Sequence, residues 1–187
     1  MSLSSEETQQ RSVLGRPKAL EVIPLGGFLI GVFDLTFAFT FYGLILGAAP
    51  LRIFQSVAAG VLGRPRAIAG GVPTFMLGIL LHFLVATCIA TVYYLATLVL
   101  PALLRYAVVS GLLYGVAAYF GMKYLILPLS AIGQRGTLPR LSIMITEIVG
   151  HAVLVGLPVA LLARRSARLN GGNSASAAKT EPNLASA

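Results

Sequence analysis

Charged side chains are scarce in this chain. Only 11% of its 187 residues are Asp, Glu, Lys or Arg, whereas 57% are hydrophobic. Soluble domains are about one quarter charged, so a water-soluble fold of this size would have too little polar surface to cover its apolar residues. The composition excludes an ordinary soluble domain and predicts an integral membrane protein.

Other absences narrow the classes of function. Cys88 is the single cysteine, which excludes an intrachain disulfide and a thiolate cluster. Trp is absent, so an aromatic belt at the membrane surface would depend on tyrosines such as Tyr93, Tyr94 and Tyr106. No phosphate-binding glycine motif appears, and no serine is arranged with a base and an acid for nucleophilic catalysis. We therefore expect the protein not to be an enzyme acting in the cytoplasm.

Four apolar runs are long enough to cross a bilayer, whose hydrocarbon core requires about 20 helical residues. The weakly alternating segments of a β-barrel are absent. The predicted fold class is therefore all-α: a polytopic membrane protein with a bundle of four transmembrane helices. The predicted spans cover about residues 22–46, 74–95, 106–127 and 141–162.

The segment between the first two spans has an amphipathic pattern. Apolar residues recur at helical spacing after Pro50, whereas Arg52, Gln55 and Ser56 fall elsewhere around the helix. We expect a helix over about residues 50–63 that lies in the membrane interface. The apolar positions are Phe54, Val57, Ala58, Val61 and Leu62.

The predicted organisation is a single transmembrane domain, residues 22–163, between two tails. Residues 1–21 form a polar cytoplasmic tail, and residues 164–187 form a basic, small-residue tail that we expect to be disordered. Eight Lys and Arg residues fall on the side of the termini and five on the other side, which predicts that both termini are cytoplasmic. Because the basic residues flank apolar runs, the +8 net charge indicates a lipid bilayer, and not nucleic acid, as the partner.

Five ionisable side chains fall at membrane depth. Inserting a central Asp or Lys into the membrane costs ~2.5–3.5 kcal/mol. Each of these side chains is therefore expected to have a partner or a function. Counted at about 1.5 Å per helical residue, all five lie in the outer half of the membrane or at its middle. This buried polar cluster consists of Asp34, His82, Lys123, Glu147 and His151.

Three interpretations of the polar cluster remain open. In the first it is structural: Glu147 pairs with Lys123 or Arg140, and His151 pairs with Asp34, so that helices are held in register. In the second it is a pocket that handles a proton or a solute. In the third, His82, Glu147 and His151 bind a metal, or the two histidines bind a b-type haem. No complete ligand-spacing signature is present, so no cofactor is predicted.

Pairs of glycines spaced four apart predict close contacts between helices, because they let two backbones approach. Asp34 falls on the helical stripe of the first pair, which turns its carboxyl toward the bundle. The pairs are Gly27 with Gly31, Gly43 with Gly47, and Gly111 with Gly115.

The fourth span and its exit, TEIVGHAVLVGLPVALLARR, resemble the last span of the YagU-like family of small bacterial inner-membrane proteins. LLHFLVATCIATVYYL and GLLYGVAAYF extend the resemblance more loosely over roughly residues 27–168, and FQSVAAGVLG resembles a segment of related uncharacterised bacterial proteins. The resemblance implies a bacterial inner-membrane location and directs attention to His82, Glu147 and His151. The family has no established biochemical activity, so no reaction follows.

Together these features predict a structural or accessory membrane subunit that uses its glycine-lined faces on a partner protein or on a second copy of itself. The alternative is an oligomeric transporter, a channel or a ligand-binding membrane protein that uses the polar cluster. A bis-histidine haem or metal site is the second alternative.

Overall fold

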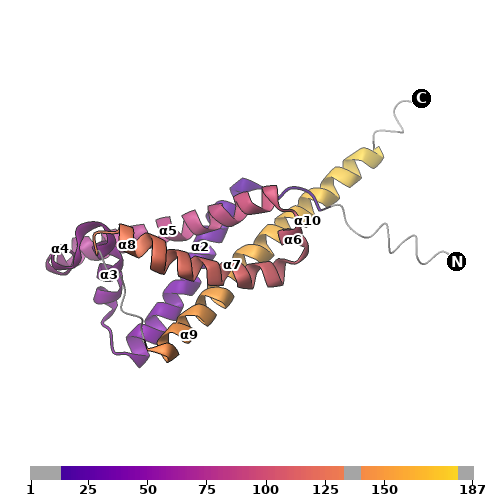
Figure 1. Cartoon of the computed structure of the whole chain (residues 1–187). Helices are drawn as coiled ribbons and strands as arrows, with labels where there is room; N and C mark the ends of the chain where they lie inside the picture. Colours follow the sequence, from indigo (N-terminus) through magenta and orange to yellow (C-terminus); the bar gives the residue numbers. More distant parts are fainter. Residues whose placement is uncertain (1–13, 133–139, 181–187) are drawn as a thin grey trace.

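The structure is a computed structural model that describes residues 14–132 and 140–180, with side chains placed up to residue 173. Within these ranges every regular element is helical. Four continuous helical rods are long and apolar enough to cross a membrane. They run lengthwise through the molecule, with the beginning of the first rod and the end of the fourth at the same end (Figure 1). The prediction of an all-α bundle with four spans is confirmed. The rods cover Ala19–Ile45, Gly71–Val99, Ala107–Leu129 and Leu141–Asn173.

Each rod except the second is built from more than one helical element. The first consists of α2 (Ala19–Ala38) and η1 (Phe39–Ile45), and the second is α5 (Gly71–Val99). The third consists of α7 (Ala107–Gly121), η2 (Met122–Ile126) and α8 (Leu127–Leu129). The fourth consists of α9 (Leu141–Gly150), η3 (His151–Gly156) and α10 (Leu157–Thr180). Three short helices connect the rods: α3 (Pro50–Leu62), α4 (Arg64–Ala69) and α6 (Ala102–Arg105).

The elements η1, η2 and η3 are π-helical stretches inside three of the spans. Two of them come just before a proline in the same rod, Pro128 and Pro158. A proline ring clashes with the carbonyl group four residues earlier, and here those carbonyl groups belong to Tyr124 in η2 and Leu154 in η3. A wider turn relieves this clash, which gives η2 and η3 a local cause in the sequence.

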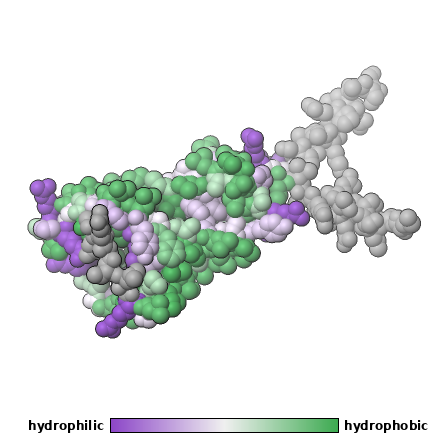
Figure 2. Space-filling view, in the orientation of Figure 1, coloured by the Kyte–Doolittle hydropathy of each residue, from purple (hydrophilic) through white to green (hydrophobic). Residues whose placement is uncertain are grey.

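Small residues form the contacts between the rods. The helix α2 packs against α5 and α10, and α7 packs against η3 and α10. Large apolar side chains such as Leu80 and Leu113 point outward instead. Figure 2 shows the resulting surface, in which hydrophobic residues cover the middle of the molecule and hydrophilic residues gather at its two ends. This distribution is typical of a bundle surrounded by lipid, where helices associate through close packing of small side chains.

Two of the three predicted glycine pairs lie where helices meet. A Cβ atom added at Gly27 or Gly31 would lie only 2.5 Å from Thr87 or Phe83 on α5. A Cβ at Gly111 would lie 2.8 Å from Ala160, and one at Gly115 would overlap the backbone of His151. These four glycines therefore let the first span approach the second and the third approach the fourth.

The remaining glycine pair does not bring two helix backbones close together. Gly47 has a φ of +72° and no atom within 4 Å of an added Cβ, so it is a turn residue after the span, where only glycine adopts this backbone without strain. A Cβ at Gly43 would be in ordinary contact, 3.7 Å from the Ala48 carbonyl oxygen. The expectation of a packing face at Gly43 and Gly47 is thus corrected, because the chain turns directly after η1.

The segment between the first two spans folds into α3 and α4, which lie at the end of the molecule opposite the termini (Figure 1). Its buried face differs from the expected one: Gln55 is buried, and Val61 is 61% exposed. Gln55 Nε2 donates to the Gly71 carbonyl oxygen and to Thr74 Oγ1, each at 3.3 Å. Because α5 supplies these acceptors, an amide can occupy a position that the periodicity assigned to the polar face.

The fourth rod continues as a helix well past Arg164, where the sequence predicted a disordered tail. Gly15 N–H donates to the Ala167 carbonyl oxygen at 3.0 Å, and Lys18 N–H donates to Ser166 Oγ at 3.0 Å. The N-terminal segment therefore packs along α10, and Ser166 and Ala167 are buried. The helix ends at Thr180, and the expected tail regions 1–13 and 181–187 lie outside the described residues.

Candidate functional site

The carboxyl group of Glu147 is the centre of a hydrogen-bond network between three spans. Tyr42 donates from its hydroxyl to Glu147 Oε1, and Tyr119 donates to Glu147 Oε2 at 2.9 Å. Lys123 Nζ in turn donates to the Tyr119 hydroxyl oxygen at 3.2 Å and lies 5.5 Å from the centre of its ring. The two carboxyl oxygens each have a donor from a different helix, so this half-buried acid is well satisfied.

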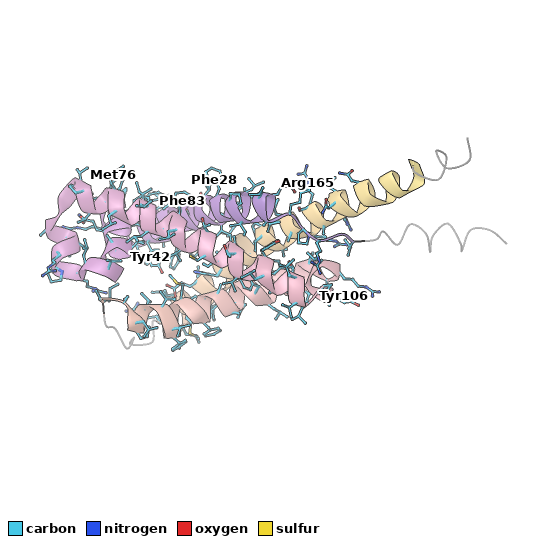
Figure 3. The ribbon with its side chains drawn as sticks, turned by 90° about the horizontal axis from the view of Figure 1, so that it is seen from above. Phe28, Tyr42, Met76, Phe83, Tyr106 and Arg165 are labelled. Atoms are coloured by element: carbon cyan, nitrogen blue, oxygen red, sulfur yellow. The ribbon has the colours of Figure 1, made fainter. Side chains whose placement is uncertain are left out.

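The three π-helical stretches border this network. Tyr42 belongs to η1, Lys123 to η2, and His151, which follows Glu147 by one turn, begins η3. Figure 3 shows Tyr42 among the rods, while Met76 lies on an outer edge of the bundle. A π-helical turn changes the direction of the side chains that follow it, and such turns recur at functional sites. Here they border the Glu147 network on three of the four spans.

Both histidines are held by backbone carbonyl groups. His151 Nδ1 lies 2.9 Å from the Glu147 carbonyl oxygen, and His82 Nε2 lies 2.9 Å from the Gly31 carbonyl oxygen. A carbonyl oxygen only accepts, so these nitrogens carry the ring protons. In the neutral rings, His151 Nε2 and His82 Nδ1 therefore remain as acceptors.

A cavity of about 360 Å³ lies between the first span, α5 and the covering helix α3. Asp34 and His82 line it from the two spans, and Tyr42 connects it with the Glu147 network. Arg52 and Ser56 contribute polar groups from α3. The other six lining side chains are apolar: Leu35, Ala38, Ala48, Ile53, Phe54 and Val57.

The carboxylate of Asp34 differs from that of Glu147 in its surroundings. Within residues 14–132 and 140–180, no hydrogen bond or ion pair reaches Asp34. Arg52 lines the same cavity, but its Nη1 donates to Gln55 Oε1 at 3.1 Å and forms no ion pair with Asp34. An ionisable group at membrane depth is expected to be paired or to serve a function. Asp34 is half-buried, faces the cavity and has no such protein partner in the described part of the chain.

The expected pairings inside the polar cluster are partly replaced by other contacts. Lys123 reaches Glu147 only through Tyr119, and Arg140 is exposed. His151 contacts the backbone of its own helix, and its ring packs edge-on at 5.4 Å from Tyr119, not against Asp34. The structure therefore divides the predicted cluster into two parts, the Glu147 network and the Asp34 cavity. Tyr42 joins them, because it donates to Glu147 and also lines the cavity.

Sequence reasoning missed Tyr42 and Tyr119, the two direct partners of Glu147. One signal was available for Tyr119, which lies four residues before Lys123 and hence on the same helical face. A second signal is general: a buried carboxyl needs donors, and tyrosine hydroxyl groups are donors that a span tolerates. No comparable signal distinguishes Tyr42 from the other tyrosines before the helices are packed.

The predicted metal or haem ligands do not form one group. Among the described residues, no set of three or more His, Cys, Asp or Glu side chains is placed to hold a metal ion. His82 lies at the Asp34 cavity, whereas Glu147 and His151 lie at Tyr119. The donor Nε2 of His82 already faces a carbonyl oxygen, so this ring does not offer that nitrogen as a ligand in the observed arrangement.

Comparison with models of protein families, with curated proteins and with solved structures returns no match. The functional argument therefore rests on the geometry of the Asp34 cavity and of the Glu147 network.

Proposed function

We propose that the protein is an integral membrane protein that binds a small organic cation in the Asp34 cavity. The observation that carries this proposal is the carboxylate of Asp34, which faces a cavity at membrane depth without a protein partner among the described residues. A bound cation would supply the missing countercharge and would remove the energetic disadvantage of an isolated carboxylate.

The lining of the cavity supports an alkylated ammonium group as the ligand. Its volume of about 360 Å³ is within the range of small-molecule sites, about 300–1,000 Å³. Tyr42 and Phe54 place aromatic rings in the wall of the same cavity. Aromatic faces and a carboxylate together attract quaternary ammonium groups, and the apolar side chains of the wall accommodate their methyl groups. The guanidinium of Arg52, which also lines the cavity, donates to Gln55.

The Glu147 network has a structural role in this proposal. It ties the first, third and fourth spans together through Tyr42 and Tyr119, and so fixes the wall of the cavity to which Tyr42 belongs. The same network supports a second candidate function, that of a structural or accessory subunit in which the cluster only holds the helices in register. The two candidates differ in the role of Asp34, which is essential for the first and dispensable for the second.

A bacterial inner-membrane location with both termini in the cytoplasm completes the proposal. The YagU-like resemblance supports the location, and the unequal distribution of Lys and Arg supports the orientation. The cavity would then open toward the periplasmic side, where α3 lies.

Selective chemical modification provides the test of the cavity. Dicyclohexylcarbodiimide adds to a carboxyl group while it carries a proton, and the O-acylisourea formed rearranges to a stable N-acylurea. A cation that holds Asp34 as the carboxylate would therefore oppose the reaction. We expect the carbodiimide to modify Asp34 and to leave Glu147 unmodified, because both oxygens of Glu147 accept hydrogen bonds from tyrosines. Peptide mass spectrometry identifies the modified residue. Choline is expected to slow the modification of Asp34, since its quaternary ammonium group would occupy the cavity.

The matched control for this experiment is 3,3-dimethyl-1-butanol, which has the shape of choline without its charge. Protection by choline alone supports a cation site. Equal protection by the neutral analogue, or no protection by any of a set of quaternary ammonium ions, contradicts the proposal. Modification of Glu147 at the same rate as Asp34 contradicts the difference that the structure assigns to the two carboxyl groups.

The orientation is tested separately by cysteine labelling in a Cys88→Ala background. We expect an impermeant maleimide added to intact cells to label Arg64→Cys, which lies at the α4 end of the molecule. Ala175→Cys, in α10 at the opposite end, is expected to react only after the membrane is permeabilised. Labelling of Ala175→Cys in intact cells would reverse the proposed orientation.

A further inference from the structure

The helices α3 and α4 carry three positive charges and no acidic residue of their own. No Asp or Glu occurs in the sequence between Leu35 and Thr146. The same stretch contains Arg52, Arg64 and Arg66 on the two connecting helices. Asp34 shares a cavity with Arg52, but within residues 14–132 and 140–180 no carboxylate forms an ion pair with any of the three arginines.

Two of these arginines line one cavity of about 290 Å³. Arg52 approaches it from α3 and Arg64 from α4, with Ser56 and Gln55 as further polar lining residues. This cavity is separate from the Asp34 cavity, although Arg52 and Ser56 border both. The remaining lining residues are apolar or small: Ala59, Ile68 and Ile132.

Buried contacts hold this arrangement in place. Gln55 is only 2% exposed and accepts a hydrogen bond at 3.1 Å from Arg52 Nη1. Its amide nitrogen also donates to Thr74 Oγ1, which donates to the Ala67 carbonyl oxygen at 2.6 Å. The guanidinium of Arg52 has five N–H donors, and the contact with Gln55 uses one of them. The others remain for a ligand, and no described residue accepts a hydrogen bond from Arg64.

We propose that the cavity between Arg52 and Arg64 binds a phosphate group of the kind found in anionic phospholipid headgroups. Guanidinium groups match phosphate oxygens in geometry and charge. The surroundings favour a lipid as the source of the phosphate, since Leu51, Val61 and Ile68 are exposed on the same two helices and would enter the interface beside the headgroup. The hydrophilic end of the molecule in Figure 2 is where Figure 1 places α3 and α4.

The test measures binding of water-soluble dihexanoylphosphatidylglycerol to the purified full-length protein in detergent, by thermal shift and by native mass spectrometry. Arg64→Gln is expected to weaken this binding about fivefold, the effect of one arginine near a phosphate surface. Arg66→Gln is the matched control: it removes the same charge from the same helix, but Arg66 does not line the cavity. Both side chains are exposed, so both variants should fold, as circular dichroism would verify.

Two further titrations distinguish the sources of the phosphate. If dihexanoylphosphatidylglycerol binds and inorganic phosphate does not compete, the ligand is a lipid headgroup. Competition by inorganic phosphate at similar concentration supports the same phosphate site with a free anion as ligand. Binding of dihexanoylphosphatidylcholine as tightly as the anionic lipid would overturn the proposal, as would equal losses in Arg64→Gln and Arg66→Gln, which would indicate only a diffuse positive field.

Discussion

Replacement of Glu147 by alanine is expected to destabilise the folded bundle by about 2–4 kcal/mol, since it removes two interhelical hydrogen bonds of about 1–2 kcal/mol each. Tyr42 and Tyr119 would lose their acceptor, and the Tyr119 hydroxyl, which accepts a hydrogen bond from Lys123, would no longer have a carboxylate to donate to. Reversible unfolding in mixed micelles with increasing dodecyl sulfate measures this loss.

Two variants serve as controls for Glu147→Ala. Glu147→Gln keeps an acceptor and nearly the same volume, so we expect a loss of about 1 kcal/mol or less. Asp34→Ala also removes a carboxyl group at membrane depth, but Asp34 has no hydrogen bond among the described residues. Its replacement should leave stability unchanged or raise it. A loss in Asp34→Ala as large as that in Glu147→Ala would show that the two carboxyl groups do not differ as the structure indicates.

Gly115→Ala is expected to cost about 2–3 kcal/mol, at the upper end of the usual range for an overpacked contact. The new methyl group would overlap the His151 carbonyl oxygen and lie 2.5 Å from Ala152 Cα. Both atoms belong to backbone and cannot rotate away, so the third and fourth spans would have to separate. This separation would also lengthen the hydrogen bond between Tyr119 and Glu147, which joins the same two spans.

Gly121→Ala provides the matched control in the same helix. No atom lies within 4 Å of an added Cβ at Gly121, so the substitution creates no contact and improves helix propensity by up to ~1 kcal/mol. The two alanine variants should therefore change stability in opposite directions in the same unfolding experiment. A neutral Gly115→Ala would mean that the third and fourth spans are not in backbone contact.

Helix geometry explains why some predicted contacts are observed and others are not. Predictions on a helical wheel assume about 3.6 residues per turn. This assumption holds through α2, where Gly27 and Gly31 face α5 and Asp34 lines the cavity between the two helices. It fails beyond a π-helical stretch such as η1, where each turn is wider and the following side chains rotate. The expected packing face at Gly43 and Gly47 lies within and after that stretch.

The sequence by itself determined the environment and the helical spans. Transfer of apolar residues into lipid is a local and additive effect, so composition and run length were sufficient to predict four spans and the amphipathic segment after Pro50. The same additivity identified Asp34, His82, Lys123, Glu147 and His151 as costly residues, because the cost of inserting an ionisable group that has no partner follows from its depth alone.

Only the tertiary structure decided how those residues are used. Glu147 meets Tyr42 and Tyr119, and Asp34 meets a cavity, although both carboxyl groups looked alike in the sequence. A hydrogen bond depends on the direction and separation of two side chains to within a few tenths of an ångström. The rotation of each helix and the close approach at Gly111 and Gly115 set these directions, and both result from packing between segments that are distant in the chain. The π-helical turns contribute as well, and for η2 and η3 part of their cause is local, in Pro128 and Pro158.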